Sequence, residues 1–180
     1  AGPAEFLMNL KNAKEAVSIP MIASLNAVNH ENWVEYARKI EETGVDGLEL
    51  NFYTVPYDFD VMDRAVINEQ LDILRSVTNE VSIPISVKLS SYYTNPLYVI
   101  REMDKIGVKA FVLFNRLFQP AIDIDTEEHF FPYNLSNPED SRLPLRFAGL
   151  LYGELDAQIC SSSGIFTGHD VISMLLSGAD

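Results

Sequence analysis

The feature that most constrains this chain is a regular alternation of two kinds of segment. Short apolar runs that end in polar residues cover 19–26, 45–52, 83–90, 108–115 and 156–163. Amphipathic stretches of helical length follow them at 33–44, 68–81, 96–107, 144–153 and 168–178, most of them ending at glycine. Continuous apolar runs are typical of parallel strands covered on both faces. The order predicts an α/β fold of five consecutive βα units.

An internal repeat favours a closed barrel over an open doubly wound sheet, the other arrangement that sequential βα units form. SIPMIASLN at 18–26 resembles SIPISVKLS at 82–90, and TGVDGLELNFY at 43–53 resembles IGVKAFVLFNR at 106–116. Such a period indicates that one supersecondary unit recurs. Neither half carries the G-x-G-x-x-G fingerprint of a dinucleotide-binding sheet. The sequence therefore predicts a TIM (β/α)8 barrel.

The length of the chain suits only part of such a barrel. A complete barrel takes about 250 residues, whereas this chain has 180. An open piece of five strands would expose unpaired edges. We expect residues 1–180 to be one partial barrel domain, truncated at both ends, with the rest of the sheet missing from this sequence or supplied by a partner.

Composition excludes several classes of function. The net charge of −13 repels phosphodiester backbones and argues against a general nucleic-acid partner. No apolar run approaches the roughly 18–20 residues that a membrane span needs, and the first residues lack the pattern of a secretory signal. The single cysteine, Cys160, excludes an intrachain disulfide and fits a reducing, cytoplasmic compartment.

Polar residues gather where the apolar runs end, which is where a barrel carries its site. They are Ser24 and Asn26; Asn51, Tyr53 and Thr54; Lys88 and Ser90; Asn115 and Arg116; and Ser161, Ser162, Ser163 and Gly164. No pair of acids suits general acid–base catalysis there, and no set of His, Asp and Glu has metal-ligand spacing. The inventory suits a polar, planar, phosphorylated ligand better than hydrolysis.

Lys88, Asn51 and Asn115 are the strongest individual candidates. Lys88 lies inside an apolar strand, where an ammonium needs an anionic or hydrogen-bonding partner; the alternative is a stem packed along the sheet with its charge in water. Asn51 and Asn115 occupy equivalent places in the two repeats. Their amides offer both donor and acceptor to a ring edge, although asparagine also caps loops and turns.

Three further features lie near these candidates. CSSSGIFTGHD at 160–170 predicts a small-residue loop before a helix, which either admits an anion to backbone N–H groups or is a plain βα turn. Glu49 is expected to face the same side as Asn51, near a lysine. Cys160 is expected to be a small buried hydrophobic residue.

The motifs IASLN, LELNFY, ISVKLS, VLFNR and SSSGI, in this order, resemble those of dihydroorotate dehydrogenases. The resemblance is closest to the soluble, class 1, dihydroorotate dehydrogenase-like branch and covers nearly all of the chain. It implies a TIM barrel, with strands 3 to 7 present here, and FMN as the cofactor. It also implies oxidation of dihydroorotate to orotate in pyrimidine biosynthesis, by hydride transfer to flavin N5 while a base removes the C5 proton.

The resemblance implies a flavin contact for Lys88, and another for Ser24. It places Asn51 near both flavin and substrate. Ser163 and Gly164 correspond to the Gly-Gly pair that holds the FMN phosphate, so a serine replaces the first glycine.

For the substrate, the resemblance implies binding by Asn51 and by Asn115. Thr54 stands where the family has a cysteine or serine as the base. No residue is implied as a metal ligand. The implied partner is a small dihydroorotate-like molecule, with no nucleic acid or membrane partner; a homodimer and the electron acceptor (fumarate, NAD or quinone) stay open.

Two other interpretations remain at this point. One is a flavin-free, phosphate-binding TIM-barrel lyase or isomerase, in which Lys88 forms a Schiff base or acts electrostatically. The other is a catalytically degenerate barrel fragment with a binding or structural role. Fold alone does not decide among them.

Overall fold

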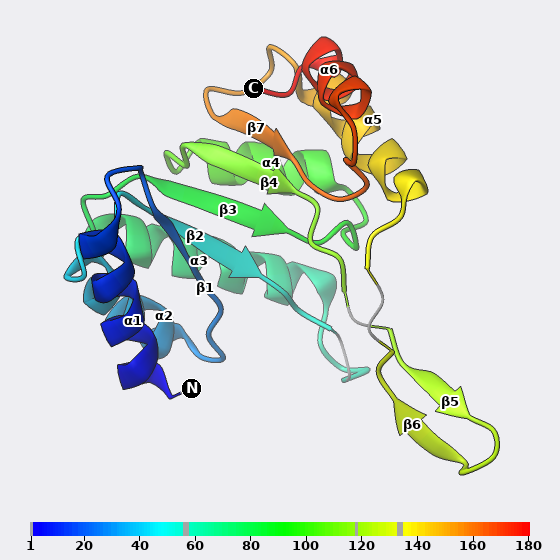
Figure 1. Ribbon diagram of the computed structural model, residues 1–180, viewed down its shortest axis with the longest axis horizontal. Helices are drawn as coiled ribbons and strands as arrows, with labels where there is room; N and C mark the ends of the chain where they lie inside the picture. The colour runs from blue at the N-terminus through cyan, green and yellow to red at the C-terminus, as the bar shows by residue number, and fades with distance from the viewer. Residues whose placement is uncertain (1, 56–57, 118, 133–134) are drawn as a thin grey trace.

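The computed structural model describes residues 2–55, 58–117, 119–132 and 135–180. Its centre is a five-stranded parallel sheet in the order β1-β2-β3-β4-β7 (Figure 1). These strands are β1 (Ile22–Leu25), β2 (Gly47–Phe52), β3 (Ile85–Leu89), β4 (Ala110–Leu113) and β7 (Gln158–Ser161). Each predicted apolar run thus contains one strand, and neighbours in sequence are neighbours in the sheet. This is the strand succession of a TIM barrel, although the described strands do not close.

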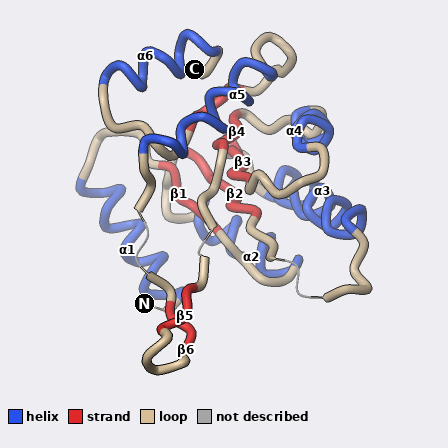
Figure 2. Tube along the Cα trace, turned by 90° about the vertical axis from the view of Figure 1, so that its right-hand side faces the viewer, coloured by secondary structure: helices blue, strands red, loops and turns tan. Residues whose placement is uncertain are grey.

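Helices connect the strands and cover one face of the sheet. They are α1 (Pro3–Ala16), α2 (His30–Glu41), α3 (Asp63–Glu80), α4 (Pro96–Asp104), α5 (Arg142–Leu151) and α6 (Gly168–Ser177), with a 3-10 turn η1 (Pro138–Ser141) before α5. Helices α2, α3 and α4 lie behind the sheet in Figure 1 and to one side of it in Figure 2. None of the helices in the described part of the chain is long and apolar enough to cross a membrane.

Strand alternation divides the sheet residues into a buried and an open face. Leu50, Val87 and Phe111 lie side by side toward the helices and are fully buried. Their strand neighbours, such as Lys88, lie on the other face, which is only partly covered. The sequence predicts that both faces of the sheet are covered, and in the described structure only the face toward the helices is. In a closed barrel the second face lines the interior. Cys160 lies on this open face and is exposed, so the prediction of a buried cysteine was wrong.

Local signals set the helix ends. The side chain of Asn29 caps α2 by accepting from Asn32 N at 3.0 Å, and Asn95 caps α4 in the same way. Thr167 and Asp170 form a capping box at the start of α6. These caps satisfy N–H groups that a helix leaves unpaired, and they lie where the chain turns from β1, β3 and β7 into the next helix.

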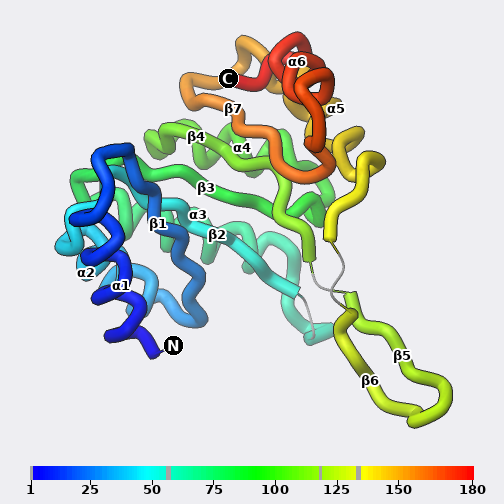
Figure 3. The backbone as a smooth tube through the Cα atoms, viewed as in Figure 1, coloured from blue at the N-terminus to red at the C-terminus, as the bar shows by residue number. Residues whose placement is uncertain are grey.

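A hairpin interrupts the βα order. Strands β5 (Ala121–Asp123) and β6 (Glu128–Phe130) pair antiparallel and protrude from the end of the sheet at which the strands finish (Figure 3). Asp123 Oδ1 fixes the turn by accepting from the N–H groups of Asp125 and Thr126. From its acidic sequence alone this segment would be read as a solvated loop. Its strands have only three residues each, which is too few for an alternating pattern to indicate a strand.

Candidate functional site

The two asparagines of the internal repeat meet at the carboxyl edge of the sheet. Asn51 lies in β2 and Asn115 follows β4; Asn115 Nδ2 donates a hydrogen bond of 2.7 Å to Asn51 Oδ1. The backbone N–H of Asn115 donates to the carbonyl of Leu89 at 2.7 Å, which fixes the start of this loop against β3. Within the described residues, the pair leaves Asn51 Nδ2 and Asn115 Oδ1 unused. One amide donor and one acceptor are thus held side by side.

Lys88 lies next to this pair on the open face. In the sheet register it is opposite Asn51 on β2 and Val112 on β4. Its side chain is half-buried, and no described residue forms a hydrogen bond or ion pair with its ammonium. A cation in the middle of a sheet face, without a protein partner, is suited to an anionic or electron-rich ligand.

Ser24 and Glu49 form a second polar contact on the same face. Ser24 Oγ donates to Glu49 Oε1 at 2.7 Å, across paired positions of β1 and β2. Glu49 therefore shares the side of Asn51, as the alternation predicts. Partial burial raises the pKa of the Cys160 thiol, Glu49 raises it further and Lys88 lowers it. The acid and the lysine thus both act on the thiol across the open face.

The loop after β7 has the backbone of a glycine pair, although its first residue is serine. Ser163 has φ +83° and Gly164 has φ +73°, a region that favours glycine. A Cβ on Gly164 would lie 2.3 Å from the backbone nitrogen of Ser141 and 2.9 Å from the carbonyl oxygen of Asn137. Close packing of the loop against η1 therefore requires glycine at 164, whereas Ser163 holds a strained conformation.

Replacing Ser163 by glycine is expected to stabilise the protein by about 0.5–1 kcal/mol, because relief of the left-handed strain exceeds the added entropy of the unfolded chain. Urea unfolding measures the difference. Ser162→Gly is the matched control, since Ser162 has no positive φ, and it should lose stability by a similar amount. Equal losses in both variants would show that Ser163 carries no strain.

Thr54 is not joined to the amide pair by a hydrogen bond in the described part of the chain. It lies beyond the end of β2, is exposed, and its Oγ1 accepts from Gln70 Nε2 of α3 at 3.4 Å. The structure thus brings together Asn51, Asn115 and Lys88, while Thr54 contacts the helix layer. Sequence reasoning missed Gln70; its signal is a polar residue within the apolar stripe of the predicted helix.

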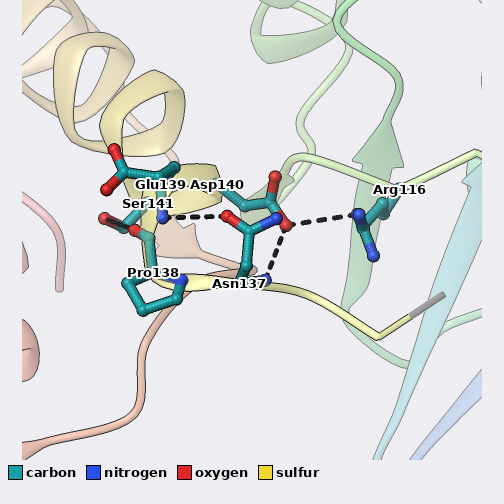
Figure 4. A network of polar contacts seen from close by, with 6 residues as sticks. All are labelled: Arg116, Asn137, Pro138, Glu139, Asp140 and Ser141. Atoms are coloured by element: carbon teal, nitrogen blue, oxygen red, sulfur yellow. Dashed lines mark hydrogen bonds and ion pairs between the residues drawn. The ribbon is translucent and has the colours of Figure 1, made fainter.

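A cleft of about 730 Å³ opens beside the amide pair, between the loops after β3, β4 and β7 and the segment around η1. Asn115 and Ser163 line it together with three arginines and two acids, which are Arg116, Arg142, Arg146, Glu139 and Asp140. Two of the arginines are paired with these acids. The wall of the cleft is held by the ion pair of Arg116 Nε with Asp140 Oδ2 at 3.2 Å (Figure 4).

Asp140 has a second function in this wall. Its Oδ2 also accepts from the N–H of Asn137 at 2.9 Å, and the Asn137 side chain accepts from the N–H of Glu139 at 3.0 Å (Figure 4). This capping box begins η1. The same carboxylate therefore closes the turn and ties it to Arg116 after β4, which sequence analysis placed at the strand end without a role. Among the described residues, no group of His, Cys, Asp or Glu is placed to hold a metal ion.

Curated relatives of this chain are dihydroorotate dehydrogenases, whereas no protein-family model matches the chain. The catalytic subunit of dihydroorotate dehydrogenase B (NAD(+)) from Thermoplasma volcanium is 29% identical over 173 residues, which are 93% of this chain and 56% of that protein. Dihydroorotate dehydrogenase A (fumarate) from Lactobacillus helveticus is 26% identical over 169 residues, 90% of this chain and 54% of that protein. The chain spans about half the length of these curated relatives.

Solved structures show the same fold at much lower identity. Phosphonopyruvate hydrolase superposes with a TM-score of 0.68 at 15% identity, covering 99% of this chain and 58% of that one. Deoxyribose phosphate aldolase from Aeropyrum pernix gives 0.61 at 15% identity, covering 98% and 68%. At this identity they support the fold alone. The resemblance predicted from the motifs is thus confirmed: over about nine-tenths of its length, this chain is similar in sequence to the dihydroorotate dehydrogenases.

Proposed function

We propose that residues 1–180 form part of the barrel domain of an FMN-dependent oxidoreductase, which oxidises dihydroorotate to orotate, or acts on a related cyclic amide, in pyrimidine biosynthesis. The observation that carries the proposal is the Asn115–Asn51 pair beside Lys88 at the carboxyl edge of the sheet. The names of the curated relatives support the reaction. The single cysteine fits a cytoplasmic compartment.

The donor set at this edge fits a flavin mononucleotide. When bound, FMN supplies the acceptor for a hydride. Lys88, Asn51 and Ser24 offer an ammonium, an amide and a hydroxyl to the ring edge. The loop at Ser163 and Gly164 has the glycine-like conformation in which successive backbone N–H groups can approach a phosphate.

The amide pair suits the substrate. A cyclic imide presents alternating N–H and C=O groups in one plane, and Asn51 Nδ2 with Asn115 Oδ1 offers the complementary donor and acceptor. Because the two amides fix each other at 2.7 Å, a bound ring would be oriented without further ordering of these side chains. Thr54 is the proposed acceptor of the C5 proton.

The visible spectrum of the full-length protein tests this function. We expect flavin absorption bands in the purified or FMN-reconstituted protein, and their bleaching when dihydroorotate is added without oxygen. A protein that takes up no FMN and does not turn over contradicts the proposal. Borohydride trapping of a substrate on Lys88 would instead support the flavin-free lyase or isomerase, because it reports a Schiff base.

A further inference from the structure

A short chain of hydrogen bonds runs behind Thr54 between β2, α3 and β3. The hydroxyl of Tyr93, in the loop after β3, donates to Gln70 Oε1 at 2.7 Å. Gln70 Nε2 then donates to Thr54 Oγ1 at 3.4 Å. Gln70 is only 5% exposed, although it lies on the face of α3 that otherwise packs apolar residues such as Leu71 and Leu74 against the sheet. A buried amide at such a place needs partners for both of its ends.

The contacts give this chain a direction: Gln70 presents its carbonyl to the Tyr93 hydroxyl and its N–H to Thr54. Burial raises the pKa of the Tyr93 hydroxyl to about 12, so Tyr93 keeps the proton that it donates at physiological pH. The Thr54 hydroxyl, which is exposed, accepts the Gln70 donor on its oxygen and has no other hydrogen-bond partner among the described residues.

We propose that Gln70 is a positioning residue that holds the Thr54 oxygen at the carboxyl edge and, through its N–H, favours negative charge on that oxygen. The inference rests on the proposed function, in which Thr54 takes the substrate proton. A hydrogen bond to the charged form of a group stabilises that form. The Gln70 N–H therefore eases the loss of the hydroxyl's own proton, which must leave as the substrate proton arrives, and Thr54 has no histidine or carboxylate partner among the described residues to assist that loss.

The proton balance of the step is simple. The substrate C5–H bond breaks, its electron pair stays on the substrate, and the proton forms a new bond to Thr54 Oγ1. The original hydroxyl proton of Thr54 passes to solvent water, which its exposure allows. Gln70 and Tyr93 exchange no proton; they hold the oxygen and stabilise it while its own proton leaves.

Gln70→Met in the full-length protein tests the inference, because methionine has a similar shape but no donor. We expect kcat for flavin reduction to fall about tenfold, the cost of one hydrogen bond to a charged group, with KM and flavin content unchanged. Tyr93→Phe, which leaves the Gln70–Thr54 contact in place, should lose less. In a Thr54→Ala background, Gln70→Met should have no further effect on kcat.

Two additional measurements separate positioning from simple stability. Thr78→Val on the same helix removes a buried hydroxyl that has no partner among the described residues, and should leave kcat unchanged. In urea unfolding, Gln70→Met and Thr54→Val should be non-additive, a readout that needs no activity. An unchanged kcat in Gln70→Met, or fully additive losses of stability in the double variant, would overturn this inference and leave the proposed function standing. A wild-type protein that dihydroorotate and related cyclic amides fail to reduce overturns the proposed function, and the inference with it.

Discussion

Replacing Gly164 by alanine is expected to destabilise the protein by about 3 kcal/mol and to abolish flavin retention. The new methyl group would lie 2.3 Å from the backbone nitrogen of Ser141, and backbone atoms cannot move aside as a flexible side chain can. The overpacking costs about 1–3 kcal/mol, and the left-handed conformation at φ +73° adds about 1–2 kcal/mol for any side chain. Urea unfolding and flavin absorbance after purification measure the two effects.

Gly44→Ala is the matched control for this substitution. Gly44 has φ +83°, yet a Cβ there would meet nothing within 4 Å. The Gly44→Ala variant should therefore lose only the conformational part of the stability, about 1 kcal/mol, and it should retain its flavin. If Gly164→Ala cost no more than Gly44→Ala, the packing of the β7 loop against η1 would not be what fixes this part of the site.

Replacing Lys88 by methionine is expected to lower FMN affinity by more than tenfold. The ammonium is the cation beside the amide pair, and no described residue neutralises it. Loss of a charged hydrogen bond of about 1.5–3 kcal/mol corresponds to roughly ten- to hundredfold weaker binding. The stability of the apoprotein should hold, because methionine preserves the packing of the lysine stem. Quenching of flavin fluorescence on titration measures the affinity.

Lys109→Met controls for the loss of one positive charge. Lys109 is exposed just before β4, at the opposite end of the sheet from the site. Its replacement changes the net charge equally, and FMN affinity should stay within about twofold if the local contact decides. Equal weakening in both variants would instead indicate a general electrostatic attraction of FMN to the chain.

The strands and the placement of the two asparagines were predictable because each depends on a local pattern. A continuous apolar run such as 83–90 identifies a buried strand, and the repeat places Asn51 and Asn115 at equivalent strand ends. Parallel strands bring equivalent ends to one edge of the sheet, which places both residues there. Because β3 lies between β2 and β4, their 2.7 Å contact also depends on the path of the chain after β4, which topology alone does not give. Lys88 is on the same face by alternation alone.

What escaped prediction depends on contacts between distant segments. The hydroxyl of Thr54 contacts α3 because Gln70 comes to lie beneath it, and no pattern near Thr54 in the sequence encodes that approach. Arg116 and Asp140 form an ion pair although the hairpin separates them in the sequence. The strands of this hairpin have three residues each, too few to show an alternating pattern. Cys160 lies exposed because only one face of the described sheet is covered.

The most direct test of the account is a crystal structure of the full-length protein with FMN. We predict that the isoalloxazine ring lies on the open face of the sheet, with Lys88 Nζ and the Asn51 amide within hydrogen-bonding distance of its edge. The phosphate should lie against the loop at Ser163 and Gly164. A flavin bound away from Lys88 and the amide pair, or a structure in which these side chains do not face a shared cavity, would contradict the account.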